Sequence, residues 1–275
     1  MTDRYAVIGN PIAHSKSPQI HAAFARQTVQ NLSYEAILAP LDGFAASAAD
    51  FIAGGGRGMN VTLPFKLDAF ALATRHTARA QAARAVNTLK VDATEVLGDN
   101  TDGAGLVADL VRNLGCPIAG RRLLLLGAGG AARGVIVPLL GESPASLTIA
   151  NRSVARALQL RDAFAVQGKL SARAFSDLAG EQFDVVINAT SASLAGQAPA
   201  VPFGIYAPGS MAYDMMYGNG LTPFLADAQS GGASRVADGL GMLVEQAAES
   251  FLLWRGVRPD TRPVLAELAA ELHGA

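Results

Sequence analysis

Three small residues that follow a run of leucines have the spacing of a dinucleotide site. Leu123–Leu126 leads directly into Gly127, and Gly127, Gly129 and Ala132 fill the small positions of the pattern G-x-G-x-x-G/A. The first small residue permits a tight turn, the second lets backbone approach a pyrophosphate, and the third lets helix and strand pack closely. The leucines predict a buried strand and residues 131–140 a helix, which favours nucleotide binding over an ordinary tight turn.

The residues after the next expected strand indicate which dinucleotide binds. This strand, Ser146–Ala150, is followed by Asn151, Arg152 and Ser153, with Arg156 one helical turn further on. An enzyme that uses NAD normally carries Asp or Glu here to bind the ribose 2′-hydroxyl, whereas arginine matches a 2′-phosphate. Solvated arginines are the alternative, but cations at a helix start are unfavourable unless an anion joins them. The pattern predicts NADP.

A lysine and an aspartate could carry proton transfer. Lys66 comes just past an expected strand, Met59–Leu63, where open α/β sheets place ligands. A solvated lysine is the usual alternative. However, this chain carries its positive charge mainly as arginine, and a lysine suits a group that must exchange a proton. Asp102 lies in the polar turn 98–103, where it could also simply cap the next helix.

Hydroxyl groups gather at another strand-to-helix junction. The expected strand Tyr5–Gly9 opens into residues 10–18, which include Ser15 and Ser17. Pro18 suits the first turn of a helix, with Ser17 as its N-cap. Capping would explain one serine, but two hydroxyls beside an amide and an ammonium group favour the binding of a polar ligand.

The elements that must position these residues alternate between strands and helices. Further strands are expected at 34–38, 85–89, 183–188 and 211–215, and helices at 19–27, 44–53, 104–114, 242–254 and 263–272. The strands 183–188 and 211–215 end where the nicotinamide half of a dinucleotide would lie. Gln246 falls in the second turn of helix 242–254, where amphipathic patterning alone would also explain it. The pattern is that of an α/β protein.

Composition bounds the class of protein. The chain has 275 residues, half of them hydrophobic, a net charge of −1 and a pI near 6.4, so bulk charge does not draw it to nucleic acid. Cys116 is the only cysteine, which excludes an intramolecular disulfide and a thiolate zinc cluster. No metal is expected, because ligand spacing is lacking among the histidines His14, His21, His76 and His273. With no signal peptide and no apolar stretch near the roughly 20 residues of a membrane span, a cytoplasmic protein is expected.

Nine motifs, in order along nearly the whole chain, resemble the shikimate dehydrogenase family. They are Gly9–Ile12 with His14–Pro18, Asn60–Thr62 with Pro64 and Lys66, Ala85–Leu89, Asn100–Gly103, Gly127–Ala131, Asn151–Arg152, Asn188–Ser191, Tyr213–Asp214 and Gly239–Gln246. The resemblance implies an N-terminal α/β substrate domain (1–103, completed by 240–275) beside an NADP-binding Rossmann domain (104–239), with a cleft between them. It also implies reversible NADPH-linked reduction of 3-dehydroshikimate to shikimate, towards chorismate and the aromatic amino acids.

The resemblance also implies roles for individual residues. Lys66 and Asp102 match the catalytic pair, and Ser15 and Ser17, helped by Tyr217, match ligands of the substrate carboxylate. The hydroxyl-binding set would be Asn60, Thr62, Lys66, Asn87, Asp102 and Gln246. The cofactor contacts would be Gly127, Ala128, Gly129, Gly130, Ala131, Asn151, Arg152, Ser153, Arg156, Thr190, Ser191, Met215 and Gly239. Three positions depart from the family pattern: Ser193 replaces a glycine, Gly218-Asn219 a proline region, and Ala78 an acidic residue.

Hydride reduction of a ketone builds negative charge on oxygen, which a proton donor must meet. Positioned proton transfer typically contributes about 10²–10⁴-fold, and the ammonium group of Lys66 suits this role with Asp102 to orient it. Two rivals are a shikimate/quinate dehydrogenase that uses NAD, against which Arg152 argues, and a catalytically inactive NADP-binding sensor, which need not keep Lys66 and Asp102. A monomer or homodimer is expected.

Overall fold

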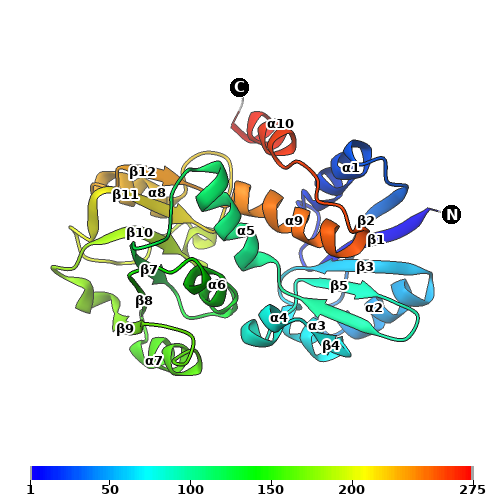
Figure 1. Cartoon of the computed structure of the whole chain (residues 1–275), viewed down its shortest axis with the longest axis horizontal. Helices are drawn as coiled ribbons and strands as arrows, with labels where there is room; N and C mark the ends of the chain where they lie inside the picture. The colour runs from blue at the N-terminus through cyan, green and yellow to red at the C-terminus, as the bar shows by residue number, and fades with distance from the viewer. Residues whose placement is uncertain (1, 274–275) are drawn as a thin grey trace. The chain divides into compact units, whose positions relative to one another are not determined.

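The computed structural model describes residues 2–273, except for the side chains of Leu194 and His273. The chain divides into two compact units (Figure 1). The substrate unit comprises the residues up to Gly105 together with Val244–Ala266, and the nucleotide unit comprises Leu106–Leu243 with the residues from Glu267 on. The domain boundaries expected from the sequence stay a prediction.

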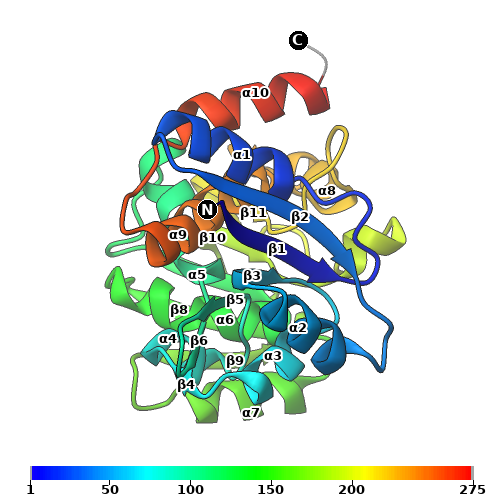
Figure 2. The same ribbon diagram turned by 90° about the vertical axis from the view of Figure 1, so that its right-hand side faces the viewer.

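The substrate unit is built on a mixed six-stranded sheet in the order β2-β1-β3-β5-β6-β4 (Figure 2). Its strands are β1 (Asp3–Gly9), β2 (Leu32–Leu38), β3 (Gly56–Val61), β4 (Arg75–His76), β5 (Thr88–Val91) and β6 (Val96–Asp99). Its helices include α1 (Ser17–Gln27), α2 (Phe44–Ala53), α3 (Lys66–Leu72) and α4 (Ala78–Ala83). β1 pairs in parallel with β2 and β3, whereas β5 runs antiparallel to both β3 and β6.

Apolar residues of β1, β3 and β5 hold this sheet on its helices. Ile8, Met59 and Leu89 are fully buried in one core cluster. Phe65, in the turn before α3, is also fully buried there, with its ring 5.2 Å from that of Phe44. Burial of the residue directly before Lys66 fixes where α3 begins, and therefore where the lysine lies.

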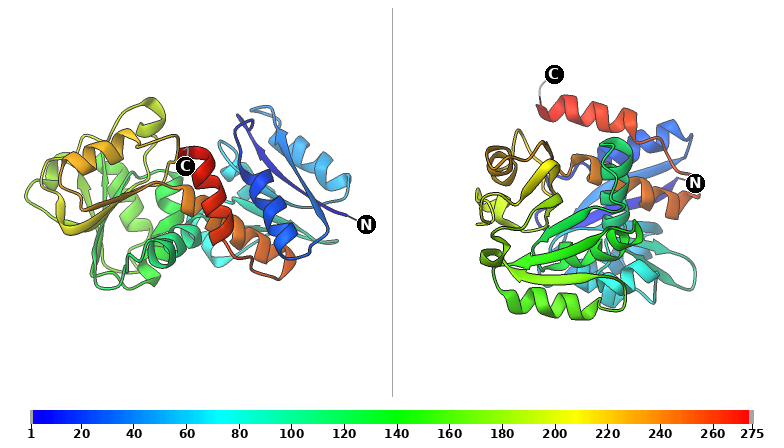
Figure 3. Two further views of the ribbon diagram at one scale, coloured as in Figure 1. Left: turned by 90° about the horizontal axis from the view of Figure 1, so that it is seen from above. Right: turned by 60° about the vertical axis from the view of Figure 1, so that its left-hand side comes forward.

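The nucleotide unit is built on a six-stranded parallel sheet in the order β12-β11-β10-β7-β8-β9 (Figure 3, right). Its strands are β7 (Arg122–Leu126), β8 (Ser146–Asn151), β9 (Leu170–Ala174), β10 (Phe183–Asn188), β11 (Tyr206–Asp214) and β12 (Arg235–Ala237). Its helices include α6 (Gly130–Gly141), α7 (Val154–Ala163) and α8 (Pro223–Ser230). The leucines of β7 are fully buried, as a central parallel strand requires. This is the doubly wound order, whose switch point lies between β7 and β10.

The remaining helices are α5, α9 and α10. Their bounds are Asp102–Ala108, Leu240–Arg255 and Arg262–His273. The expected helix 104–114 starts two residues earlier than predicted and continues past Ala108 as a π-helical turn, Asp109–Asn113. None of the described helices combines the length and apolar character needed to cross a bilayer.

Several boundaries differ from the sequence-based expectation. The strand expected at 85–89 lies at Thr88–Val91, because residues 85–87 form the turn that leads from α4 into the sheet. Part of the expected polar turn 98–103 is strand, since β6 pairs with β5 as far as Asp99. Elements that were not predicted are α3, α4, α8, β4, β6, β9 and β12.

Candidate active site

Lys66 and Asp102 meet in the substrate unit. Lys66 is the first residue of α3 and Asp102 the first residue of α5. The Lys66 Nζ donates to Asp102 Oδ2 over 2.5 Å, and the side chains are 28% and 12% exposed. Because both are partly shielded while the ammonium group retains access to solvent, the pair can hold and exchange a proton.

A buried asparagine orients the carboxylate of this pair. The Asn87 side-chain amide donates to Asp102 Oδ1 over 2.8 Å and to Gln246 Oε1 over 3.2 Å. Its carbonyl oxygen accepts from the backbone N–H of Thr101 over 2.9 Å. The two oxygens of Asp102 are thus divided between Lys66 and Asn87, which fixes the plane of the carboxylate and the approach of the ammonium group.

The charged pair of Arg79 and Asp99 supports the turn that carries Asp102. Arg79 donates from Nε and Nη2 to the two oxygens of Asp99, over 2.7 and 2.6 Å. Burial would raise the pKa of Asp99, but the hydrogen bonds and charge of Arg79 outweigh it and lower that pKa below its ordinary value. Sequence reasoning missed this pair, because residues twenty positions apart give no local signal of contact.

The two predicted carboxylate ligands lie at the start of α1. Ser15 Oγ accepts from the backbone N–H of Ser17 over 3.3 Å, and the Ser17 side chain is hydrogen-bonded to Tyr34. The expectation that Ser17 caps α1 is wrong. The N-cap is Lys16, without a side-chain capping bond, and Ser17 is already helical. Its hydroxyl is therefore directed to a side chain rather than to the helix backbone.

Thr62 and Asn60 differ in what surrounds them. Thr62 follows β3 and is half-buried, with its backbone N–H bonded to the carbonyl of Ile8 over 3.0 Å. Asn60 is 6% exposed, and its side chain is committed to protein partners. It accepts from Tyr34 over 2.7 Å and donates to Ser250 Oγ over 2.9 Å.

The glycine cluster lies at the carboxyl end of β7, as the motif predicts. Gly127 has φ +109°, a conformation that favours glycine, and its N–H donates to the carbonyl of Ala150 over 2.8 Å. A Cβ at Gly129 or Gly130 would meet no atom within 4 Å. The loop is therefore open where these Cβ atoms would lie, and the first N–H groups of α6 need partners from outside the helix, which fits a pyrophosphate. Ala128 and Ala131 complete this loop.

The loops after β10 and β11 lie beside that cluster. Thr190 bonds back to the side chain of Asn188 through both its N–H and its hydroxyl, over 3.1 and 2.7 Å, and Ser191 follows it on the surface. The Met215 N–H donates to the Asn188 carbonyl over 3.0 Å. A Cβ on Gly239 would lie 2.3 Å from the Met215 carbonyl oxygen. Thr190, Met215 and Gly239 thus come from neighbouring strand ends.

Ser193, which departs from the family pattern, has a structural partner. Its hydroxyl donates to Asp214 Oδ2 over 2.7 Å, and Thr222 donates to the same oxygen over 2.6 Å. Asp214 is fully buried at the end of β11, so these bonds satisfy its carboxylate. The departure adds a tether between the loop after β10 and β11.

The residues expected at the 2′ position extend from the end of β8 into the first turn of α7. Asn151 ends β8 and donates from its side chain to the Ser153 carbonyl over 3.0 Å. Arg152 and Arg156 are exposed, and within residues 2–273 neither side chain has an ion-pair partner. Two uncompensated guanidinium groups beside a helix start fit an anionic group.

Tyr217 belongs to the nucleotide unit. It is half-buried, and burial, with a smaller contribution from the negative charge of Asp238, raises the pKa of its hydroxyl. The hydroxyl is therefore protonated and can donate a hydrogen bond at neutral pH.

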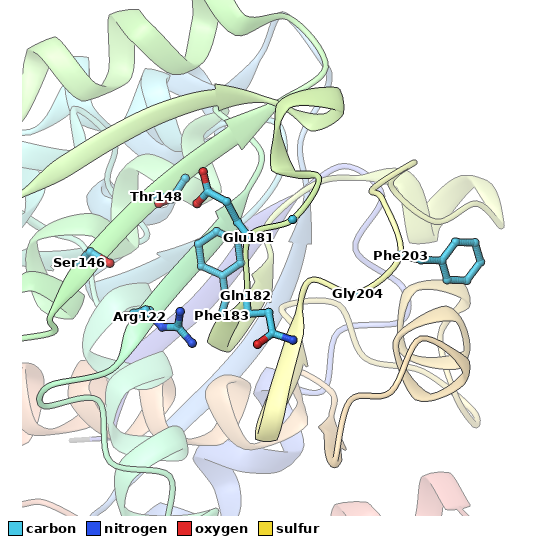
Figure 4. A pocket seen from close by; sticks show the side chains of 9 residues that line it. Arg122, Ser146, Thr148, Glu181, Gln182, Phe183, Phe203 and Gly204 are labelled. Atoms are coloured by element: carbon cyan, nitrogen blue, oxygen red, sulfur yellow. The ribbon is translucent and has the colours of Figure 1, made fainter.

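The hollow whose lining residues are drawn in Figure 4 lies at the amino ends of the strands of the nucleotide sheet, opposite the glycine cluster. It measures about 520 Å³ and is lined by the starts of β7, β8 and β10, including Arg122, Ser146 and Phe183. Phe203 points away from these residues, and Arg122 pairs with Asp184. Because open parallel sheets bind ligands at their carboxyl edge, this hollow is separate from the candidate site. Among the described side chains, no three His, Cys, Asp or Glu gather in a way that could hold a metal ion; the side chain of His273 lies outside that set.

Comparisons with known proteins agree along the whole chain. Residues 7–89 match the shikimate dehydrogenase substrate binding domain, 109–195 the shikimate / quinate 5-dehydrogenase family, and 239–269 the shikimate 5′-dehydrogenase C-terminal domain. The shikimate dehydrogenase (NADP(+)) of Aromatoleum aromaticum is 66% identical over 99% of both chains.

Solved structures give the same result. The Ael1 enzyme from Pseudomonas putida is 52% identical, with a TM-score of 0.92 over 97% of this chain and 98% of its own. The shikimate 5-dehydrogenase of Thermus thermophilus, solved in complex with NADP(H) and shikimate, is 32% identical, with a TM-score of 0.86 over 98% of this chain and 100% of its own. Two α/β units with these sheets are therefore shared with solved relatives.

Proposed function

The chain belongs to the shikimate dehydrogenase family, and from that premise we propose that Lys66 and Asp102 carry its reaction. The protein is an NADP-dependent oxidoreductase that interconverts 3-dehydroshikimate and shikimate, a step of the shikimate pathway. The single observation behind the proposed pair is the 2.5 Å contact between Lys66 Nζ and Asp102 Oδ2, with Asn87 on the other carboxylate oxygen.

Lys66 acts as the proton donor in reduction and the acceptor in oxidation. NADPH, when bound, supplies the hydride that reduces the substrate ketone. As charge develops on the ketone oxygen, the ammonium group of Lys66 gives it a proton, which removes the charge from the transition state. Asp102 keeps the ammonium group directed at the reacting oxygen, and Asn87 holds Asp102 in that orientation.

The substrate is bound mainly by hydroxyl and amide groups of the substrate unit. Ser15 and Ser17 bind its carboxylate, to which Tyr217 adds a donor. Its hydroxyls are bound by Thr62, Asn87, Asp102 and Gln246. Asn60 belongs to the same set by resemblance. Its buried hydrogen bonds to Tyr34 of β2 and Ser250 of α9 support a role in positioning the end of β3, which Thr62 follows.

The cofactor is held by the carboxyl edge of the nucleotide sheet. The pyrophosphate binds the loop Gly127–Ala131 and the start of α6, and the 2′-phosphate binds Asn151–Ser153 and Arg156. Thr190, Ser191, Met215 and Gly239 line the nicotinamide half. The open space at Gly129 and Gly130 supports this assignment.

A spectrophotometric assay tests the proposal. Purified protein with shikimate and NADP+ should give reduced cofactor at its absorbance band, and quinate or NAD+ in place of either partner should give a lower kcat/KM. Absence of cofactor reduction with shikimate by a folded protein would contradict the proposed function. A kcat/KM for NAD+ equal to that for NADP+ would contradict the role of Arg152 and Arg156.

A further inference from the structure

Tyr34, in the middle of β2, shares its hydroxyl between two residues of the substrate unit. It donates to Asn60 Oδ1 over 2.7 Å, and Ser17 is its second hydrogen-bond partner. Its ring stacks on that of His21, with centroids 4.3 Å apart and planes 8° from parallel. The stack fixes the position of the hydroxyl oxygen. Because a tyrosine hydroxyl carries one proton, it can donate a hydrogen bond to only one of these two partners at a time.

The direction of each hydrogen bond follows from the chemistry of the partners. The Asn60 side-chain nitrogen donates to the Asn87 carbonyl over 3.3 Å, an atom that can only accept. The Asn60 side-chain oxygen must therefore face Tyr34 and accept a hydrogen bond from it. The Tyr34 hydroxyl thus donates its proton to the bond with Asn60. The Tyr34 oxygen then accepts from Ser17, whose single hydroxyl proton is directed away from any ligand.

A carboxylate at Ser17 reverses this arrangement. Carboxylate oxygens only accept, so Ser17 must turn its proton to the ligand. Tyr34 can then donate to Ser17, because Asn60 Oδ1 keeps a second donor, His21 Nε2 at 3.1 Å. Consecutive hydrogen bonds from Tyr34 to Ser17 to the carboxylate polarise one another, which makes Ser17 a stronger donor.

His21 is suited to hold this second bond. Burial lowers the pKa of its ring to about 3, partly offset by the bond to Asn60, so the ring is neutral. Its Nδ1 is buried and, within the described residues, has no hydrogen-bond partner. The one ring proton therefore stays on Nε2, where it satisfies Asn60 after Tyr34 has turned away.

We propose that Tyr34 is a positioning residue for the substrate carboxylate. When the substrate binds, the Tyr34 hydroxyl stops donating its hydrogen bond to Asn60 and donates it to Ser17 instead. Tyr34 does not touch the substrate but acts through Ser17. The inference rests on the proposed function, because it takes Ser17 as a carboxylate ligand.

A double-mutant cycle between Tyr34→Phe and Ser17→Ala tests the inference. Tyr34→Phe keeps the ring stack and removes only the hydroxyl. We expect it to raise KM for shikimate about 3- to 10-fold, the loss of one hydrogen bond, with KM for NADP+ unchanged and kcat within about twofold. In the Ser17→Ala background it should change KM for shikimate by less than about twofold, because its only route to the substrate is gone.

Tyr5→Phe is the matched control. It removes a tyrosine hydroxyl from the same sheet, bonded to Arg255 over 3.3 Å, and should leave both KM values unchanged. An equal penalty for Tyr34→Phe in both backgrounds, or a joint change of both KM values and kcat, would reveal a merely structural role and overturn the inference.

The cycle separates this inference from the proposed function. Wild-type protein without shikimate-dependent cofactor reduction, or Ser17→Ala with an unchanged KM for shikimate, would contradict the proposed function. A raised KM in Ser17→Ala beside an unchanged KM in Tyr34→Phe would overturn the inference alone.

If Tyr34→Phe does not fold, NMR of protein labelled with ζ-13C-tyrosine replaces the kinetic test. It observes the chemical shift of each tyrosine ring carbon that bears the hydroxyl. The chain has five tyrosines, and Tyr217→Phe removes the one proposed to contact the substrate. In that background, shikimate should shift one tyrosine signal, and the shift should vanish on Ser17→Ala. Signals that do not move with shikimate, or that move equally with and without Ser17, would overturn the inference.

Discussion

His21 links the stability of the protein to pH. The pKa of its ring is lowered by burial to about 3, against an ordinary value of 6.5 in the unfolded chain. The unfolded state therefore binds a proton that the folded state excludes, and the free energy of unfolding falls as pH decreases from 6.5 towards 3. By pH 4.5, two pH units below 6.5, this linkage removes about 2–3 kcal/mol.

Urea unfolding of wild type and His21→Phe checks this prediction. The variant keeps an aromatic ring between its neighbours and cannot titrate, so all other groups contribute equally to both proteins. The wild type should lose about 2–3 kcal/mol relative to the variant between pH 7 and pH 4.5. If the difference in the free energy of unfolding between the two proteins does not change with pH, His21 is protonated in the folded protein as easily as in the unfolded chain.

At the residue scale, we propose that Arg152 determines the choice between NADP and NAD. Its exposed guanidinium group is proposed to bind the 2′-phosphate that distinguishes NADP from NAD. Arg152→Ala should lower kcat/KM for NADP+ about 10- to 100-fold, the loss of a charge-assisted hydrogen bond, and leave kcat/KM for NAD+ unchanged.

Arg161→Ala is the control for this substitution. It removes an arginine in the last turn of α7, which pairs with Asp162 over 2.7 Å. Steady-state rates with each cofactor should be those of wild type. Equal losses with both cofactors in Arg152→Ala would contradict a specific contact with the 2′-phosphate.

We propose that the turn from β7 into α6 is the element that binds the cofactor pyrophosphate. Gly129 and Gly141 lie at the two ends of α6, and a Cβ at either would meet no protein atom within 4 Å. Gly129→Ala should therefore fold, but its methyl group would occupy the space through which backbone approaches the pyrophosphate. We expect KM for NADP+ to rise about 5- to 150-fold, equivalent to the 1–3 kcal/mol of an overpacked contact.

Gly141→Ala supplies the comparison. It makes the same change at the far end of the same helix and should leave KM for NADP+ unchanged. Thermal unfolding distinguishes lost binding from lost folding in both variants. A normal KM for NADP+ in Gly129→Ala would exclude the glycine loop as the phosphate site.

Element by element, local signals explain what could be predicted. The ranges of α2 and β10 were predicted without error, since apolar residues at helical or strand spacing were bounded by clear breakers. β6 was missed because it is four residues long and ends in Asp99, whose burial depends on distant Arg79. α8 had a usable signal that was overlooked: Thr222, whose side chain accepts from Leu225 N–H, followed by a proline in the first turn.

The members of the candidate site stay predictions from the sequence, and their mutual contacts could not be predicted. Motif order identifies Lys66 and Asp102, yet no spacing rule predicts that residues 36 positions apart meet at 2.5 Å. Tyr34 and His21 were not predicted at all, because an aromatic residue in a strand and a histidine on a helix are typical of a core. The role that we propose for them rests on hydrogen bonds and ring contacts that the fold forms between β2, α1 and β3.

At the scale of the whole molecule, attraction for the anionic cofactor must be local. The net charge is −1, so no overall field concentrates an anion. We propose that the start of α6 and the arginines before and within α7 supply the positive potential instead. The expectation of a monomer or a homodimer stays a prediction. Light scattering of the purified protein would measure its molecular mass in solution.

We propose that the ammonium group of Lys66 exchanges the proton of the reacting oxygen. Initial rates of Lys66→Ala with shikimate and NADP+, on protein whose thermal unfolding matches wild type, test it most directly. Lys90→Ala, a lysine of β5 outside the site, is the control. We expect Lys66→Ala to lose about 10²–10⁴-fold in kcat, the usual contribution of positioned proton transfer, with KM little changed. A kcat near that of wild type, with or without a large rise in KM, would contradict it.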